Sequence, residues 1–204
     1  INMQGYSQTV GELNMVSGSA LNLNGGALTV TDGGVVDGQN ALIGGGNLTV
    51  SGTNVLTIKE NNGGLSGLVD IDAGAHVALN KPQGLGTGAI SNEGTLELDG
   101  AAGSLVNAIS GANGDVSLTN GADIWISADN SAFGGTFTTD SGSKVTFTQA
   151  NQIGSAAIQN SGTTTFNIDA RALNLTNAIT GAGTVVKDGA GTLLIDTAQA
   201  YTGN

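Results

Sequence analysis

The chain of 204 residues contains no cysteine, one proline and one histidine. Without cysteine it can form neither a disulfide framework nor a thiolate metal site. A lone histidine leaves most transition-metal sites short of ligands. No stretch approaches the roughly 18 consecutive apolar residues that a membrane-spanning helix requires. The sequence therefore predicts a chain without a disulfide scaffold, metal ion or cofactor.

Charge is also scarce, because only 10% of the residues are charged, and 16 acidic residues against 5 basic ones give a net charge of -11. Nucleic-acid phosphates require a basic surface, so we expect no nucleic-acid partner. Hydrophobic residues nevertheless reach 39%, which is too many for an intrinsically disordered chain. The 35 glycines follow no Gly-X-Y period, which excludes collagen.

The first residues, INMQGYSQTV, include neither the basic segment nor the apolar segment of a signal peptide. We therefore expect the chain to be a processed product or a piece of a longer protein.

The sequence partly repeats itself when Gly67 is placed on Gly135, and we call this internal similarity the long repeat. The matching segments are Gly67–Leu79 with Gly135–Phe147, Gly88–Leu98 with Ala156–Phe166 and, after a two-residue insertion, Asn107–Ala112 with Asn177–Ala182. This predicts one repeat near 53–120, a second near 121–190 and a truncated third from 191. Because no linker separates them, we expect one continuous domain over residues 1–204.

Within each repeat, apolar residues alternate with polar ones. The i, i+2 pairs are Leu28/Val30, Leu48/Val50, Leu56/Ile58, Val77/Leu79, Leu96/Leu98, Val116/Leu118, Val145/Phe147 and Leu193/Ile195. This alternation predicts strands of about four to six residues with one buried face. Glycine, asparagine or aspartate follows most pairs and indicates a turn.

Short strands at this density favour a solenoid. Coils of roughly 20–25 residues would place three coils in each repeat and about nine in the chain, stacked about 4.8 Å apart. We therefore predict an all-β parallel β-helix, with few aromatic rings because its core is narrow. Asn-Gly and Asp-Gly pairs, such as Asn120-Gly121, are typical of β-hairpin turns, so a fold built from hairpins remains an alternative.

The last residues, NAITGAGTVVKDGAGTLLIDTAQAYTGN, resemble the passenger-associated repeat of bacterial autotransporters. The positions that match its motif are Gly181, Gly183, Lys187, Gly189, Gly191, Thr192, Leu193, Ile195, Tyr201, Thr202 and Gly203. Val185 stands where leucine is common in the family. Asn107–Gly135 is similar to a decayed copy of the motif, with Phe133 in the tyrosine position and no lysine.

This resemblance implies a right-handed parallel β-helix that a C-terminal translocator barrel in the parent chain exports across the outer membrane of a Gram-negative bacterium. The passenger is then displayed at the cell surface or released. We expect it to act in adhesion or self-association, with itself on neighbouring cells or a host surface ligand as partner. A structural stem that displays another domain, or a polysaccharide-active β-helix enzyme, are the alternatives.

Asp140-Ser141-Gly142 is similar to the sequence around a serine-protease nucleophile, and His76 is the one available base. In the repeat alignment His76 corresponds to Lys144, so we expect the two segments at equivalent corners about 14 Å apart. We interpret both as turns and predict no catalytic residues.

Other segments suggest ligands more weakly. Asp70 and Asp72 share a strand face, as calcium-binding or acid–base carboxylates would, but solvated corner carboxylates are the preferred interpretation. Arg171 is the lone arginine, whereas catalytic β-helices carry basic residues in their groove. Gly44–Asn47 is one imperfect copy of a calcium-binding repeat, and Gly181–Gly183 follows no dinucleotide-binding pattern.

Trp125 lies between Ile124 and Ile126. If these isoleucines point inward, the indole points outward, where an exposed aromatic ring can contact a partner. Cover by a neighbouring loop is the alternative.

Overall fold

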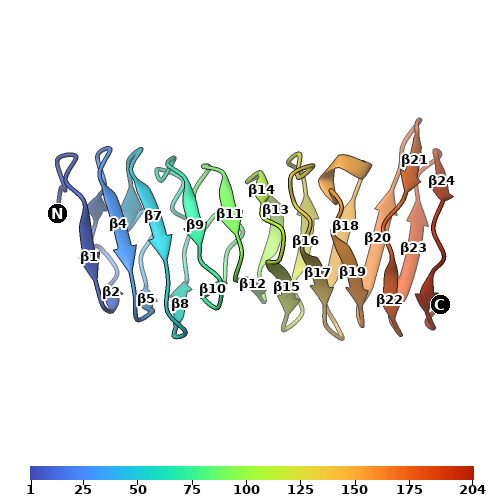
Figure 1. The fold of residues 1–204 in the computed structure, drawn as a ribbon, viewed down its shortest axis with the longest axis horizontal. Helices are drawn as coiled ribbons and strands as arrows, with labels where there is room; N and C mark the ends of the chain where they lie inside the picture. Colours follow the sequence, from blue (N-terminus) through green and yellow to red (C-terminus); the bar gives the residue numbers. More distant parts are fainter.

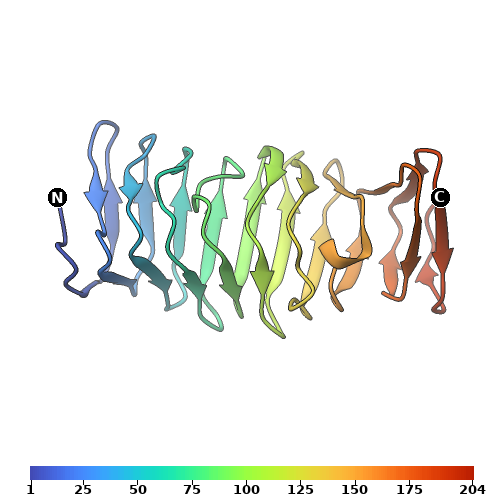
Figure 2. The ribbon, with the colours of Figure 1, turned by 90° about the horizontal axis from the view of Figure 1, so that it is seen from above.

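The computed structural model describes residues 1–204 as a stack of 25 short strands with one 3-10 helix, η1 (Ala150–Gln152). Every strand pair is parallel. The strands follow one another along the long axis, with the termini at opposite ends (Figures 1 and 2). No helix has the length and apolar character needed to cross a membrane.

One sheet of ten strands runs along the whole stack. Its strands, in spatial order, are β2 (Leu13–Met15), β5 (Gly34–Val36), β8 (Val55–Ile58), β10 (His76–Leu79), β12 (Thr95–Asp99), β15 (Asp115–Thr119), β17 (Thr136–Thr139), β19 (Ala157–Asn160), β22 (Ile179–Gly181) and β25 (Ala200–Tyr201). The order never departs from the chain order, so each coil adds one strand to the previous one.

The remaining strands form shorter sheets. A six-stranded sheet holds β1 (Gln8–Val10), β4 (Ala27–Val30), β7 (Asn47–Val50), β9 (Val69–Ile71), β11 (Ile90–Asn92) and β14 (Ile109–Ser110). A five-stranded sheet holds β13 (Ala102–Leu105), β16 (Asp123–Ile126), β18 (Lys144–Phe147), β20 (Thr163–Asn167) and β23 (Thr184–Asp188). Two pairs complete the set: β3 (Leu21–Asn22) with β6 (Leu42–Ile43), and β21 (Ala172–Leu175) with β24 (Thr192–Ile195).

The strand register gives the length of a coil. Val77 pairs with Leu56 on one side and with Leu96 on the other, and Leu96 pairs with Val116. One coil therefore takes about 20 residues, at the short end of the periods that solenoid repeats adopt. Ten strands in the long sheet delimit nine such steps, so the predicted parallel β-helix of about nine coils is confirmed.

The interior is one continuous core of 43 buried residues. Seven of the eight predicted i, i+2 pairs are buried at both positions, and the exception is the pair Leu193/Ile195 in the last coil. Four phenylalanines are also fully buried and form a column: Phe133, Phe137, Phe147 and Phe166, with successive ring centroids 5.3, 5.2 and 6.1 Å apart. The expectation that this core has little room for rings is therefore wrong.

Glycines permit the close approach of successive coils at one corner. A Cβ atom added to Gly67 would lie 2.0 Å from the carbonyl oxygen of Gly46, and one added to Gly88 would lie 1.9 Å from that of Gly67. Neither position tolerates a side chain without a shift of the backbone. The stacking distance thus requires glycine at this corner.

The long repeat is not in step with the coils. β9 and β10 belong to the six- and ten-stranded sheets, but their repeat counterparts β17 and β18 belong to the ten- and five-stranded sheets. Three coils carry the chain from Val77 only as far as Phe137, whereas the repeat counterpart of Val77 is Val145, one strand further on. Equivalent residues therefore lie on neighbouring faces, and the prediction of three whole coils per repeat is wrong.

Candidate functional site

The outward face of the ten-stranded sheet is the one surface that continues through all nine coils. The six-stranded sheet ends at Ser110 and the five-stranded sheet begins at Ala102. Because side chains alternate along a strand, burial of Leu96 and Leu98 turns Glu97 outward, and burial of Val116 and Leu118 turns Ser117 outward. Thr138 continues this row on the next strand.

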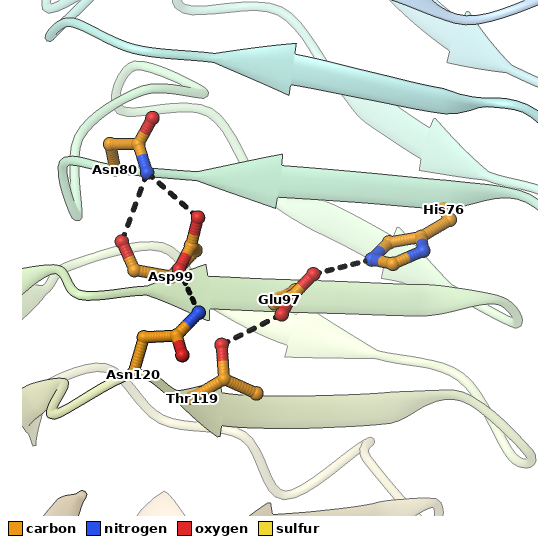
Figure 3. A network of polar contacts seen from close by, with 6 residues as sticks. All are labelled: His76, Asn80, Glu97, Asp99, Thr119 and Asn120. Carbon is orange, nitrogen blue, oxygen red and sulfur yellow. Dashed lines mark hydrogen bonds and ion pairs between the residues drawn. The ribbon is translucent and has the colours of Figure 1, made fainter.

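Hydrogen bonds join the outward side chains of neighbouring coils. The Glu97 carboxylate lies 2.8 Å from His76 Nε2 on the preceding coil and accepts a hydrogen bond of 2.7 Å from the Thr119 hydroxyl on the following one (Figure 3). One carboxylate thus links three successive strands, β10, β12 and β15. We call the outward side chains His76, Asn80, Glu97, Asp99, Thr119 and Asn120 the polar ladder.

The second half of the polar ladder lies at the corner that follows the strands. The Asp99 carboxylate accepts hydrogen bonds from Asn80 Nδ2 at 3.1 Å and from Asn120 Nδ2 at 2.6 Å (Figure 3). The backbone N–H of Asn120 in turn donates to Asp140 at 3.2 Å. Amide and carboxylate groups thus alternate from coil to coil, and these contacts hold the side chains in defined positions.

Beside the polar ladder, Asp115 is partly buried at the start of β15. Burial raises the pKa of the Asp115 carboxyl group above its usual value, and the hydrogen bond of 2.7 Å that the Thr138 hydroxyl donates to it acts in the opposite direction. Because burial is the larger influence, the folded state disfavours the ionised carboxylate.

Two turn carboxylates have the opposite shift. Backbone and side-chain hydrogen bonds from Ala112 and Asn113 lower the pKa of Glu93, and hydrogen bonds from Ser131 and Asn151 lower the pKa of Asp129. Both carboxylates favour the ionised form, so they stabilise their turns above the usual aspartate and glutamate range and lose this effect as the pH falls.

Trp125 lies on β16 in the five-stranded sheet, on a different face from the polar ladder. Ile124 and Ile126 are buried on either side, and Trp125 as a whole residue is 41% exposed, as the alternation predicts. Its partners in the neighbouring strands are Ser104 and Thr146. Its role as a partner contact stays a prediction.

The residues of the C-terminal motif make the last turns of the stack. Lys187 lies on β23, Thr192, Leu193 and Ile195 lie on β24, and Tyr201 lies on β25. The backbone of Gly181 and Gly189 has positive φ, at 98° and 77°. Cβ atoms added to Gly183, Gly191 and Gly203 would lie within 2.5 Å of a carbonyl oxygen of the preceding coil. Thr202 donates its backbone N–H to Gly181. The motif is therefore a set of corner and strand positions.

The segments that suggested catalysis remain apart. His76 begins β10, whereas Asp140 follows β17, three strands further along the same sheet. Ser141 and Gly142 form an exposed turn. The neighbouring Ser143 hydroxyl holds this turn, because it donates to Asp140 at 2.5 Å and accepts from the N–H of Ala122 at 3.1 Å. Lys144 lies on the five-stranded sheet, so the expectation that His76 and Lys144 occupy equivalent corners is wrong. No group of three or more acidic or histidine side chains is placed to hold a metal ion.

The polar ladder itself was not recognised from the sequence. Its members follow or interrupt the apolar pairs, as in Leu96-Glu97-Leu98-Asp99, so their outward direction was readable. Which of them meet depends on the length of each coil, and only the strand register shows that His76 comes to lie beside Glu97.

Comparison with known proteins relates the chain to a bacterial lipoprotein. No protein-family model and no solved structure matches the chain. An uncharacterized lipoprotein, YdeK of Escherichia coli (strain K12), is 38% identical over 149 residues, which are 72% of this chain and 11% of that protein. The chain thus spans about a tenth of the length of this relative.

Proposed function

We propose that this chain is a segment of a bacterial cell-envelope protein that acts by surface contact, in self-association or adhesion. The observation that carries the proposal is the ten-stranded sheet, whose outward face continues through every coil. Many weak contacts repeated along one surface together give strong binding. Once one contact has formed, the groups that form the next contact are already at high local concentration. The envelope location rests on the relative, which is a lipoprotein.

The polar ladder supports contact through this face. Its side chains are held by hydrogen bonds between coils, such as Thr119 to Glu97 and Asn120 to Asp99. Groups that are already ordered lose less conformational entropy when a partner binds. Threonine, asparagine and serine side chains on the same face offer both donors and acceptors to a like surface or a host ligand.

The autotransporter type is part of the proposal and rests on the C-terminal motif from Gly181 to Gly203. It requires a translocator barrel in the parent chain and export across the outer membrane. Stacking of each coil on a preformed strand edge lets folding proceed from one end. Folding outside the membrane would then favour export.

Sedimentation equilibrium of the purified chain, over a range of protein and salt concentrations, tests the proposal. Two copies that each carry a net charge of -11 repel one another, so we expect self-association to strengthen when moderate salt screens that repulsion. Association that salt leaves unchanged or weakens would contradict contact between these polar, acidic faces.

A structural stem is the second candidate. The observation that favours it is the continuous core of 43 residues, which no linker interrupts. A stem that displays another domain would remain a strictly monomeric, elongated particle at every concentration in the same experiment.

A further inference from the structure

A cleft with a volume of about 520 Å³ lies away from the ten-stranded face. One wall is the corner after β18, residues 148–151, and the other is the corner after β20 together with the start of β21, residues 167–174. The corner that leads into β21 rises above its neighbours in Figure 1, and η1 forms the adjacent wall. Two neighbouring coils thus enclose the hollow.

A buried side chain fixes the first wall. Gln152 is 5% exposed, and its Oε1 atom accepts hydrogen bonds from the backbone N–H groups of Thr148 at 2.7 Å and Gln149 at 3.2 Å. Its Nε2 atom donates to the Thr148 hydroxyl at 3.0 Å. The corner is therefore held in shape without a ligand.

The same hollow recurs in the other copy of the long repeat. A smaller cleft of about 220 Å³ is lined by Asn61, Pro82, Gln83 and residues 102–104, and all but Asn61 have counterparts in the larger cleft. In the repeat alignment, Pro82 and Gln83 correspond to Ala150 and Asn151 in the larger cleft. After the two-residue insertion, residues 102–104 correspond to 172–174, which also line it. The cleft is thus a feature of the repeat.

The insertion enlarges the second copy. β12 and β13 are joined by two residues, 100–101, whereas their counterparts β20 and β21 are joined by four, 168–171. Ile168 is buried and anchors the longer corner, and Asp169 and Arg171 are exposed in the cleft. The longer corner therefore brings a carboxylate and the lone guanidinium of the chain to this site.

The chemistry of the lining points to a ligand class. Asn167 supplies an amide group, and Asp169 and Arg171 supply one charge of each sign. The amides of Asn151 and Asn174 also line the cleft, but they already bond to Asp129 and Asp196. The ion pairs of the molecule involve other residues, so the guanidinium is free to bind a ligand. Such a set donates to and accepts from vicinal hydroxyl groups, and the net charge of -11 disfavours polyanions.

We infer that the larger cleft binds a segment of a neutral polysaccharide, with Arg171 as a donor to its hydroxyl groups. The volume lies within the range of small-ligand sites, about 300–1,000 Å³. This site goes beyond the proposed self-association, because it lies on different elements from the polar ladder and needs no second copy of the chain.

The chain offers two unique probes for a nuclear magnetic resonance titration: the Arg171 Nε–H, at the cleft, and the Trp125 indole N–H, on β16. Cellotetraose, maltotetraose and mannotetraose are added to the intact chain, with a tetragalacturonate as the anionic comparison. We expect at least one neutral tetrasaccharide to shift the Arg171 resonance saturably. A dissociation constant on the order of 1 mM is expected.

Two matched variants test whether Arg171 itself binds the sugar, and in both the backbone amide resonances of Asp169 and Asn174, which line the cleft, report the binding. Arg171→Gln should weaken binding about tenfold, as the loss of a hydrogen bond to a charged donor does. Lys81→Gln removes the same charge from an exposed residue outside the larger cleft and should leave binding unchanged. No shift with any neutral sugar, tighter binding of tetragalacturonate, or equal loss in both variants would each overturn the inference. Sedimentation without sugar reports separately on self-association.

Discussion

At the scale of single residues, the phenylalanine column concentrates the packing of the C-terminal half of the stack. Phe137 lies between Phe133 and Phe147, at centroid distances of 5.3 and 5.2 Å, and all three are fully buried. The composition shows how many phenylalanine rings the chain has, but not that they contact one another. Phe133 and Phe147 lie on different sides of the coil interior. Three-dimensional closure of the coil brings them together.

Phe137→Ala should lower the free energy of unfolding by about 3–5 kcal/mol, because it leaves a cavity and removes two aromatic contacts. Urea denaturation measures the loss. Trp125→Ala, at a half-exposed position, is the control and should cost less than half as much. Equal losses in the two variants would contradict the described core.

Asp115 gives a prediction for pH. Because burial raises its pKa in the folded state, the folded chain binds this proton more tightly than the unfolded chain does. Stability is therefore lost as the pH rises from the usual aspartate value through the raised one. Asp115→Asn should melt at a higher temperature than the wild type at pH 7, and the difference should vanish below about pH 3.9.

The control for Asp115→Asn is Asp70→Asn, which removes one charge from the outward face of the six-stranded sheet. Thermal unfolding of the three proteins at several pH values makes the comparison. An equal gain at Asp70 would assign the effect to net charge rather than to burial.

At the scale of strands and corners, the sequence was most informative. Apolar alternation placed pairs such as Val77/Leu79 inside, and glycine and asparagine marked the corners. The reason is local, since both signals depend on neighbouring residues only. Which glycines touch the preceding coil was not predictable, because this depends on how coils are superposed.

Two glycine-to-alanine variants distinguish the cost of a close contact between coils from the effect of replacing a glycine that has open space around it. Gly67→Ala should cost about 1–3 kcal/mol, because the new Cβ atom would lie 2.0 Å from the Gly46 carbonyl oxygen. Gly63→Ala has open space, with nothing within 4 Å, and should change stability by less than about 0.5 kcal/mol. Urea unfolding measures the stability of both variants. Similar losses of unfolding free energy in the two variants would contradict the close stacking of coils at this corner.

At the scale of the whole molecule, the fold was predictable and the placement of equivalent residues was not. The long repeat is visible in the sequence, but the length of each coil emerges only from the register of strands such as β8, β10 and β12. The long repeat is longer than three coils by one strand. Each repeat therefore places its residues one face further around the axis of the stack than the repeat before it. Equivalent clefts therefore lie at different corners, and Trp125 and the polar ladder lie on different faces.

The central claim is that copies of the chain meet through the outward face of the ten-stranded sheet. Ser117→Glu adds a carboxylate to that face beside Glu97, and Ser91→Glu adds the same charge beside Asp70 on the six-stranded sheet. Both serines are half-buried, which makes the pair closely matched.

Sedimentation equilibrium at moderate salt compares the two variants with the wild type, after circular dichroism has verified that both are folded. Like charges brought together at an interface cost several kcal/mol, so Ser117→Glu should weaken self-association at least about tenfold while Ser91→Glu leaves it unchanged. Equal weakening in both variants, or weakening in Ser91→Glu alone, would contradict the assignment of this face.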